Sequence, residues 1–227
     1  MNKLIVIARL RCDFPTKFGL ARQSGLNEDV KGQIVFEKEY RNPDAVRGIE
    51  NFSHLWLIWG FSVPEKDNWS ATVRPPRLGG NERVGVFATR SPFRPNPLGL
   101  TVVKLESVDY EDAGAPVLRI SGADMMDNTV IYDIKPYIPY ADIRPDAEGS
   151  FAEEHKDDRL AVIADEHILS AVPKAKHPAL LKALSLDPRP AYQNDPNRVY
   201  GFLYAGWDVR FTVENGTLTV KEIVRAT

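Results

Sequence analysis

The sequence predicts a mainly β protein, in which an N-terminal antiparallel β-barrel-like domain precedes a small α+β domain. The first 140 residues contain short runs rich in valine, isoleucine and aromatic side chains, each bounded by turn residues, and such runs are typical of strands. No amphipathic pattern long enough for a crossover helix lies between them. This disfavours a parallel doubly wound sheet, and the regular spacing favours a barrel or a sandwich.

Each run has the length and the flanking turns expected of one strand. In chain order, the predicted strands span residues 4–10, 33–40, 54–61, 83–90, 100–110, 117–121 and 129–134. The first run is apolar but is not followed by a small-residue cleavage site, so we interpret it as a strand and not as a signal peptide. Every apolar run is far shorter than the roughly 20 residues of a membrane span, so we expect no membrane association.

A polar, acidic stretch separates the two predicted domains. Eight acidic residues lie between Asp146 and Glu166, against only Lys156 and Arg159. We therefore predict a barrel domain over 1–142, an acidic linker over 143–159 and an α+β domain over 160–227.

The second domain has its own pattern of elements. A strand and a short helix come first, then leucines and alanines at helical spacing in residues 177–186, and three strands close the chain. Residues 214–217 read ENGT, and Asn-Gly accepts the positive φ angles of a type I′ hairpin turn.

The formal net charge of −2 conceals an asymmetry between the two halves of the chain. Residues 1–98 carry 15 basic and 10 acidic side chains, a balance of +5, whereas residues 99–227 carry 14 basic and 21 acidic, a balance of −7. A basic half is a sign of nucleic-acid contact. Cys12 is the only cysteine, which excludes an internal disulfide and indicates a reducing, cytoplasmic location.

The stretch 73–105 is the most informative part of the sequence. Between Arg74 and Arg94 it contains five arginines and one acid, Glu82, interleaved with prolines and glycines. Proline restricts φ and glycine permits close backbone approach, so we predict shaped loops on either side of the strand 83–90. Guanidinium groups suit carboxylates, phosphates and bases. The loops are predicted to hold an anionic or nucleotide-like ligand; the alternative is a proline-rich connection with solvated arginines.

Two other segments offer donors or stacking groups. The loop 17–26 presents Arg22, Gln23 and Gly25, although an ordinary loop has the same composition. In the segment 187–193, prolines hold Arg189 and Tyr192 in an extended stretch where they can stack on a base.

Several common sites are not supported. There is no G-x-G-x-x-G after a strand and no P-loop motif, so dinucleotide and P-loop sites are disfavoured. Asp124, Asp127 and Asp133 are spaced by three and six residues but lack the glycine and glutamate of a calcium loop. No histidine pair has metal-ligand spacing, and we expect no metal; the four histidines are His54, His155, His167 and His177.

Five ordered segments together resemble the TsaA-like, or TrmO, family of tRNA methyltransferases, also called YaeB-like. They read KFGLARQSGL, DAVRGIENFSHLWLIWGF, VRPPRLGGNERVGVFATRSPFRPNPLGL, DIKPY and DPRPAYQ. The resemblance implies an N-terminal β-barrel with a small C-terminal α+β domain, S-adenosylmethionine as cofactor, and a homodimer. It implies methyl transfer to N6 of a threonylcarbamoyl-modified adenosine beside the anticodon of tRNA.

Carried over onto this sequence, the resemblance implies a composite cofactor site. Its residues are Gln23, Ser24, Gly25, Phe61, Ser62, Arg90, Leu100, Ser121, Gly122, Ala123 and Asp124. The basic half then becomes the tRNA platform, with Arg74, Arg77, Arg83 and Arg94 predicted to meet phosphates, and Arg189 and Tyr192 to approach the anticodon loop. Asp127 is a candidate proton acceptor, but no catalytic residue is assigned.

The chain departs from the family pattern at three places. The family's PRQPG is residues 21–25 here, reading ARQSG; its Phe-His is Phe61-Ser62; and its DGTPV is residues 127–131, reading DNTVI. The lost histidine keeps two alternatives open. One is a non-catalytic β-barrel that binds RNA or an adenosine-type ligand, and the other is a methyltransferase that acts on another small acceptor.

Overall fold

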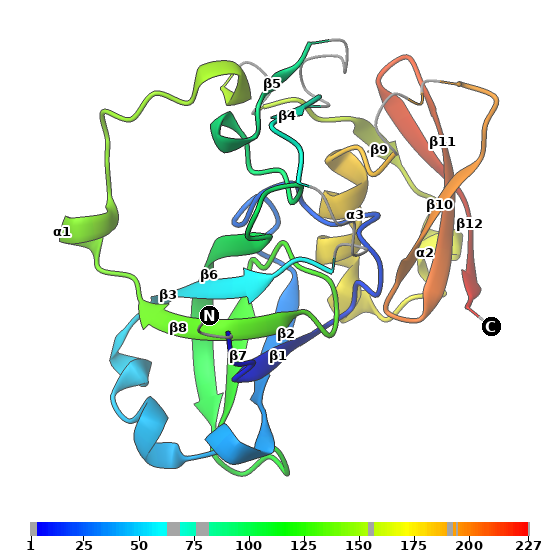
Figure 1. Cartoon of the computed structure of the whole chain (residues 1–227). Coiled ribbons are helices and arrows are strands. Elements are labelled where there is room, and N and C mark those ends of the chain that lie inside the picture. Colours follow the sequence, from blue (N-terminus) through cyan, green and yellow to red (C-terminus); the bar gives the residue numbers. More distant parts are fainter. Residues whose placement is uncertain are drawn as a thin grey trace.

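The computed structural model describes residues 4–62, 69–75, 82–153, 157–189, 193 and 195–226. Six strands close a barrel in the order β1-β2-β7-β6-β3-β8, and every neighbouring pair is antiparallel. The strands are β1 (Ala8–Cys12), β2 (Lys31–Phe36), β3 (His54–Gly60), β6 (Leu98–Asp109), β7 (Val117–Ser121) and β8 (Val130–Pro136). The predicted antiparallel barrel is therefore confirmed (Figure 1).

Side chains alternate between the inside and the outside of the barrel, as the two-residue period of a strand requires. In β3, Leu55, Leu57 and Trp59 are buried while the residues between them are partly exposed. These side chains belong to one apolar cluster with Ile34, Leu118 and Ile131 of the other strands.

The predicted strand 83–90 is wrong in extent and in place. Only β5 (Val84–Gly85) is extended, and it pairs with β4 (Thr72–Val73) in a separate two-stranded sheet. The chain then turns through η5 (Val86–Ala88), where Val86 is buried but Phe87 is 73% exposed. The run favoured a strand because it contains valine and phenylalanine, yet it pairs with no strand of the barrel.

A 3-10 helix shortens the strand predicted over 33–40. The run 33–40 ends as a strand at Phe36 and continues as η1 (Lys38–Tyr40), and η2 (Pro43–Val46) and η3 (Ile49–Asn51) lead to β3. After the barrel, the chain passes α1 (Pro139–Asp142) and η6 (Ser150–Ala152).

The last part of the chain forms a second layer of helix and sheet. Its elements are β9 (Ala161–Ile163), α2 (Glu166–Leu169), η7 (Lys174–Lys176), α3 (His177–Ser185), β10 (Tyr200–Tyr204), β11 (Trp207–Glu214) and β12 (Thr217–Arg225). The sheet order is β10-β11-β12-β9, with β9 parallel to β12. The three predicted closing strands are confirmed. Asn215 and Gly216 have φ angles of 48° and 74°, as the type I′ turn requires.

A loop between β1 and β2 joins the two parts. Phe14 and Val30 are buried in the apolar cluster of the second part, beside Leu180 and Phe211. The Asn27 amide donates to the carbonyl of Ala179 in α3 at 2.9 Å, and Figure 1 shows this blue loop beside α3. The second core is therefore completed by residues from the barrel half. Across the ranges described above, each helix is too short or too polar to cross a membrane.

Candidate functional site

A chain of buried polar groups lies at the mouth of the barrel. The indole N–H of Trp59 donates to Thr101 Oγ1 at 2.9 Å, and the Thr101 hydroxyl donates to Asp124 Oδ1 at 2.8 Å. Thr101 is 1% exposed and Trp59 is 8% exposed. Because a buried polar group is costly when unpaired, this arrangement fixes the Asp124 carboxylate in one orientation.

Two residues that are predicted to bind the cofactor, Ser24 and Arg90, also act on Asp124. The backbone amide of Ser24 donates to its carboxylate, and the charge of Arg90 acts on it. Burial raises the pKa of Asp124 above its ordinary value, while the Thr101 hydroxyl, Arg90 and Ser24 act to lower it. The Arg90 guanidinium in turn donates to the side-chain oxygen of Gln23. Of the residues implied by the resemblance, Ser24 and Arg90 therefore act on the Asp124 carboxylate directly, and Gln23 is joined to it through Arg90.

Two glycines bring the loop 17–26 against the end of β7. The Gly25 amide donates to the Gly122 carbonyl at 3.1 Å, and the Gly122 amide donates to the Val30 carbonyl at 3.0 Å. Both glycines have positive φ, 76° for Gly25 and 81° for Gly122, a conformation that other residues adopt at a cost. This contact joins segments that are almost 100 residues apart in sequence.

Beside this contact lies a pocket of about 250 Å³. It is lined by Ser24, Gly25, Glu28, His54, Val102, Lys104, Ser121 and Gly122. The hydroxyl of Ser121 donates to Glu106 at 2.7 Å. Ser121 and Lys31, with Lys104 nearby, hold the pKa of Glu106 down at about 2. The rim of the pocket therefore carries fixed charges of both signs.

The other residues predicted to bind the cofactor differ in their burial. The Phe61 ring packs on Trp59 with centroids 4.3 Å apart, and the Phe61 amide donates to the Pro97 carbonyl at 3.0 Å. Ser62 is exposed, Leu100 is 57% exposed on the outside of β6, and Ala123 is buried in the barrel core.

Sequence reasoning missed several residues of this region. Trp59 and Thr101 hold Asp124, and Glu28, His54 and Lys104 line the pocket. A signal for Trp59 was present, since alternation in β3 directs it inward with Leu55 and Leu57. A threonine within the apolar run 100–105 was a weaker signal, because threonine is also common in exposed strand positions.

The arginines predicted to meet tRNA fall into two groups. Arg74 and Arg83 are exposed next to β4 and β5, where Arg83 Nε donates to Thr72 Oγ1 at 2.8 Å. Arg94 is half-buried, and its guanidinium donates to the carbonyls of Val86 and Thr89 at 3.4 and 3.2 Å. Arg77 and Tyr192 lie outside the described residues.

Arg189 has a different environment from the other arginines. Its guanidinium makes two hydrogen bonds of 2.8 Å to the Asp187 carboxylate, and its side chain is only 14% exposed. Burial acts to raise the pKa of Asp187, but this pKa lies below its ordinary value because Arg189 donates hydrogen bonds to the carboxylate. This pairing shapes the segment that follows α3.

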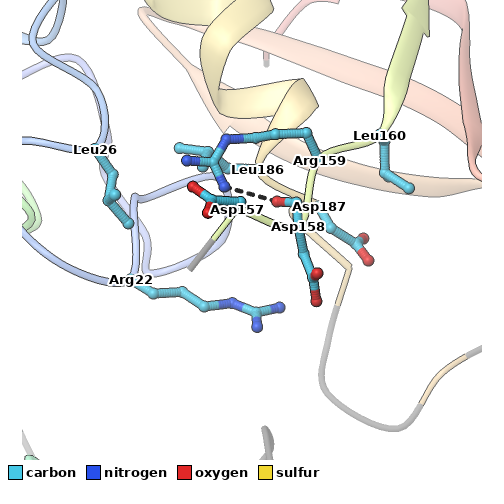
Figure 2. Close-up of a pocket in the computed structure, with 8 residues that line it drawn as sticks. All are labelled: Arg22, Leu26, Asp157, Asp158, Arg159, Leu160, Leu186 and Asp187. Atoms are coloured by element: carbon cyan, nitrogen blue, oxygen red, sulfur yellow. Dashed lines mark hydrogen bonds between the residues drawn. The ribbon is translucent and has the colours of Figure 1, made fainter. Parts of the chain in front are cut away.

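Asp187 also lines a pocket of about 540 Å³ between the loop 17–26 and the second part of the chain. Figure 2 shows Arg22 reaching into this pocket from the loop, opposite Arg159 and Leu160. Asp157 and Asp158 line it as well. Two arginines and three aspartates give mixed charge, which favours neither an anion nor a cation.

Asp127, the candidate proton acceptor, lies at the end of β1. Its carboxylate accepts from the Cys12 amide at 3.0 Å and lies 3.6 Å from the Arg11 guanidinium. This is the environment of a residue that fixes a turn. Among the described residues, no group of three or more His, Cys, Asp or Glu side chains is placed to hold a metal ion.

The fold defines a class of protein built on a closed antiparallel barrel, and the residues predicted to bind the cofactor include a group around Asp124 beside that barrel. The chain belongs to the tRNA-methyltransferase O family. The model of that family's N-terminal domain matches residues 9–143, and the model of its C-terminal domain matches residues 158–226. The resemblance of the five sequence segments is therefore confirmed.

Individual relatives agree along most of the chain. The tRNA (adenine(37)-N6)-methyltransferase of Escherichia coli (strain K12) is 40% identical over 216 residues, 91% of this chain and 89% of that protein. A Pseudomonas aeruginosa protein, RcsF, is 37% identical over 89% of this chain and 88% of that protein; its name makes it a candidate S-adenosylmethionine-dependent methyltransferase. The crystal structure of TrmO from Pseudomonas aeruginosa matches with a TM-score of 0.78 and 29% identity, covering 99% of each chain.

Proposed function

We propose that this protein transfers a methyl group from S-adenosylmethionine to N6 of adenine 37 in tRNA. Membership of the tRNA-methyltransferase O family supports the reaction, as does the name of the Escherichia coli relative. The observation that carries the proposal to this chain is the Asp124 carboxylate, held by Thr101 from within the barrel and facing Ser24 and Arg90. The acceptor in this proposal is the threonylcarbamoyl-modified adenosine.

The residues around Asp124 suit the chemistry of the donor. S-adenosylmethionine supplies a methyl group on a sulfonium, next to an adenosine and an amino-acid end that carries both charges. A fixed carboxylate such as Asp124 binds a ribose hydroxyl or an amine, and Arg90 suits a carboxylate. Phe61 and the exposed Leu100 are the apolar residues of the proposed site.

The acceptor sets a second task for the protein. The lone pair of N6 is delocalised over the ring and the carbamoyl group, so this nitrogen is a weak nucleophile. Alignment with the methyl group, exclusion of water and removal of the N6 proton are therefore the contributions expected of the chain. Asp127 is bonded to Cys12 in the folded chain, so we leave the proton acceptor unassigned.

The remaining parts of the proposal concern organisation and partners. The division into a barrel domain (1–142), an acidic linker (143–159) and an α+β domain (160–227) is supported by the existence of two apolar clusters, although Phe14 and Val30 of the first range belong to the second cluster. We further propose a homodimer in the cytoplasm, because a chain of 227 residues offers a small footprint for tRNA. Sedimentation that finds only monomer at micromolar concentration would contradict the dimer.

One experiment separates the proposed reaction from its two alternatives. The protein is incubated with methyl-labelled S-adenosylmethionine and bulk tRNA, and labelled nucleosides are identified by mass spectrometry. Label on the threonylcarbamoyl adenosine supports the proposal. Donor binding without label supports a binding module, and label on another acceptor supports a different methyltransferase.

A calorimetric titration with S-adenosylmethionine tests the proposed site itself. Arg90→Ala should abolish donor binding, because it removes the cation beside Asp124 and the donor to Gln23. Arg210→Ala is the matched control, since Arg210 is an exposed arginine paired with Asp208 on β11. Normal affinity of Arg90→Ala would remove Arg90 from the site.

A further inference from the structure

Three large aromatic side chains are exposed in the segments that precede β6, and two of them are in contact. Trp69, Phe87 and Phe93 are 51%, 73% and 46% exposed. The rings of Trp69 and Phe87 are stacked, with centroids 6.2 Å apart and planes inclined by 24°. Adjacent exposed rings of this size mark an interaction surface more often than they mark ordinary protein surface. We call the pair Trp69 and Phe87, with Arg94, the ring platform.

A cation is fixed next to these rings. The guanidinium carbon of Arg94 lies 6.0 Å from the Phe87 ring centroid. Its Nη2 donates to the carbonyls of Val86 and Thr89, so the position of the charge is set by the backbone. An arginine over an aromatic face is a stable contact, and the guanidinium also has the donor geometry that suits phosphate.

The backbone around the platform is cross-linked by hydrogen bonds. The Ser70 amide donates to the Phe93 carbonyl at 3.2 Å, and the Val86 amide donates to the Ala71 carbonyl at 3.0 Å. The β4–β5 ladder pairs Thr72 with Gly85. Three separate segments therefore hold the two rings in place, which reduces the conformational entropy that a partner must remove on binding.

The charges near the rings indicate the kind of partner. Arg83 directly precedes β5, is exposed, and donates a hydrogen bond to Thr72. Arg94 lies beside the Phe87 ring. The stretch from Arg74 to Arg94 contains a single acidic residue, Glu82. Exposed rings interleaved with arginines are the combination that binds single-stranded nucleic acid, where bases stack on rings and phosphates meet cations.

We propose that Trp69 and Phe87 form a stacking platform for an unpaired base of the tRNA anticodon loop, while Arg94 and Arg83 meet the adjacent phosphates. This inference rests on the proposed function and deepens it, because it names the groups that recognise the loop. The stem of tRNA contributes through phosphates alone, whereas the loop has bases free to stack. Substitution of a ring should therefore lower RNA affinity without changing its salt dependence, whereas substitution of an arginine should change the salt dependence as well.

The test measures binding of an anticodon stem-loop RNA over a range of salt concentrations. Trp69→Ala and Phe87→Ala should each weaken binding about tenfold with an unchanged salt slope, since stacking releases no counterions. Arg94→Ala should reduce the slope by about 1. Tyr140→Ala is the control, because Tyr140 is an aromatic that is 88% exposed on α1. RNA should also quench tryptophan fluorescence in the wild type and less in Trp69→Ala.

Two further readouts make the outcomes decisive. If the wild type methylates tRNA and both ring variants bind RNA as tightly as the wild type does, the ring platform is overturned and the proposed function stands. Wild type that binds no tRNA overturns both. If Trp69→Ala converts a dimer to a monomer in sedimentation and RNA affinity per protomer is unchanged, the rings contact a second copy of the chain and the proposal is wrong.

Discussion

The mouth of the barrel and the ring platform use polar and aromatic side chains in opposite ways. At the mouth, Trp59 is buried and its indole is bonded to Thr101. On the ring platform, Trp69 is half exposed and its ring contacts another exposed ring. The first tryptophan is part of the folded structure before any ligand arrives. The second is positioned by the fold and remains half exposed, and in the proposal above the anticodon loop covers it, so the two regions should respond differently to substitution.

The largest expected difference between the two regions is in the stability lost when a glycine is replaced by alanine. A Cβ at Gly99 would lie 2.1 Å from the Trp59 ring, whereas a Cβ at Gly85 would meet nothing within 4 Å. Gly99→Ala should therefore lower the free energy of unfolding by about 3 kcal/mol. Gly85→Ala, the matched control, should change it by less than about 0.5 kcal/mol. Urea unfolding measures both, and equal effects would contradict the rigid packing inferred for the barrel mouth.

The next effect concerns the hydroxyl that holds Asp124. Thr101→Val keeps the shape but leaves the Trp59 indole without its partner and removes one of the donors to the Asp124 carboxylate, which should cost about 2 kcal/mol of stability. Affinity for S-adenosylmethionine should fall roughly tenfold, as a loss of about 1.4 kcal/mol in binding would give. Thr101→Ser retains the hydroxyl and should bind the donor like the wild type. Equal donor affinity in the Val and Ser variants would show that Thr101 does not position Asp124.

The pH dependence of stability should differ in sign between a buried and an exposed carboxylate. The pKa of Asp124 is raised, so its contribution to stability is fully present below the unfolded value and is lost as pH rises through the folded pKa. The pKa of Glu106 is lowered from 4.5 to about 2, so its contribution is present above 4.5 and is lost as pH falls toward 2.

Unfolding measured from pH 7 to pH 3 tests these signs. Relative to Asp124→Asn, the wild type should gain stability on acidification. Relative to Glu106→Gln, the wild type should lose stability over the same change, by a small amount because an ion pair at the surface is screened. Parallel curves for both variants would contradict the assigned environments.

The smallest effect on the fold is expected at an exposed arginine. Arg83→Ala should change the free energy of unfolding by no more than about 0.5 kcal/mol, because its bonds to Thr72 lie at the surface. The same substitution should weaken tRNA binding at low salt and reduce the salt slope by about 1. Unchanged tRNA affinity would place the phosphate contacts elsewhere.

The sequence predicted the barrel well because its signals are local. Alternation in the run 54–61 and the spacing of the strands depend on neighbouring residues, and so does the Asn215-Gly216 turn. The run 83–90 misled for the same reason: its composition favours a strand, but only Val84 and Gly85 find a partner. Strand pairing is decided by residues distant in sequence, which composition does not report.

The candidate site is harder to predict because its contacts are long-range. The loop 17–26 is an ordinary loop by composition, yet Gly25 bonds Gly122 and Ser24 bonds Asp124. The family resemblance named these residues without explaining how they meet. Nothing in the sequence indicated the role of Thr101, because that role depends on a hydrogen bond to Asp124, which lies in the connection between β7 and β8. Arg189 was predicted as a tRNA contact from its motif, and its pairing with Asp187 could not be seen in the sequence.

The loop between β1 and β2 has a consequence for modularity. Its Phe14 is fully buried in the core of the second sheet, while its Ser24 and Gly25 line the pocket on the barrel. The two parts of the chain are thus not freely interchangeable units. An evolutionary or engineered exchange of the C-terminal part would have to provide a new cover for Phe14, and a poor cover would disturb the pocket-lining residues Ser24 and Gly25 about ten residues further along.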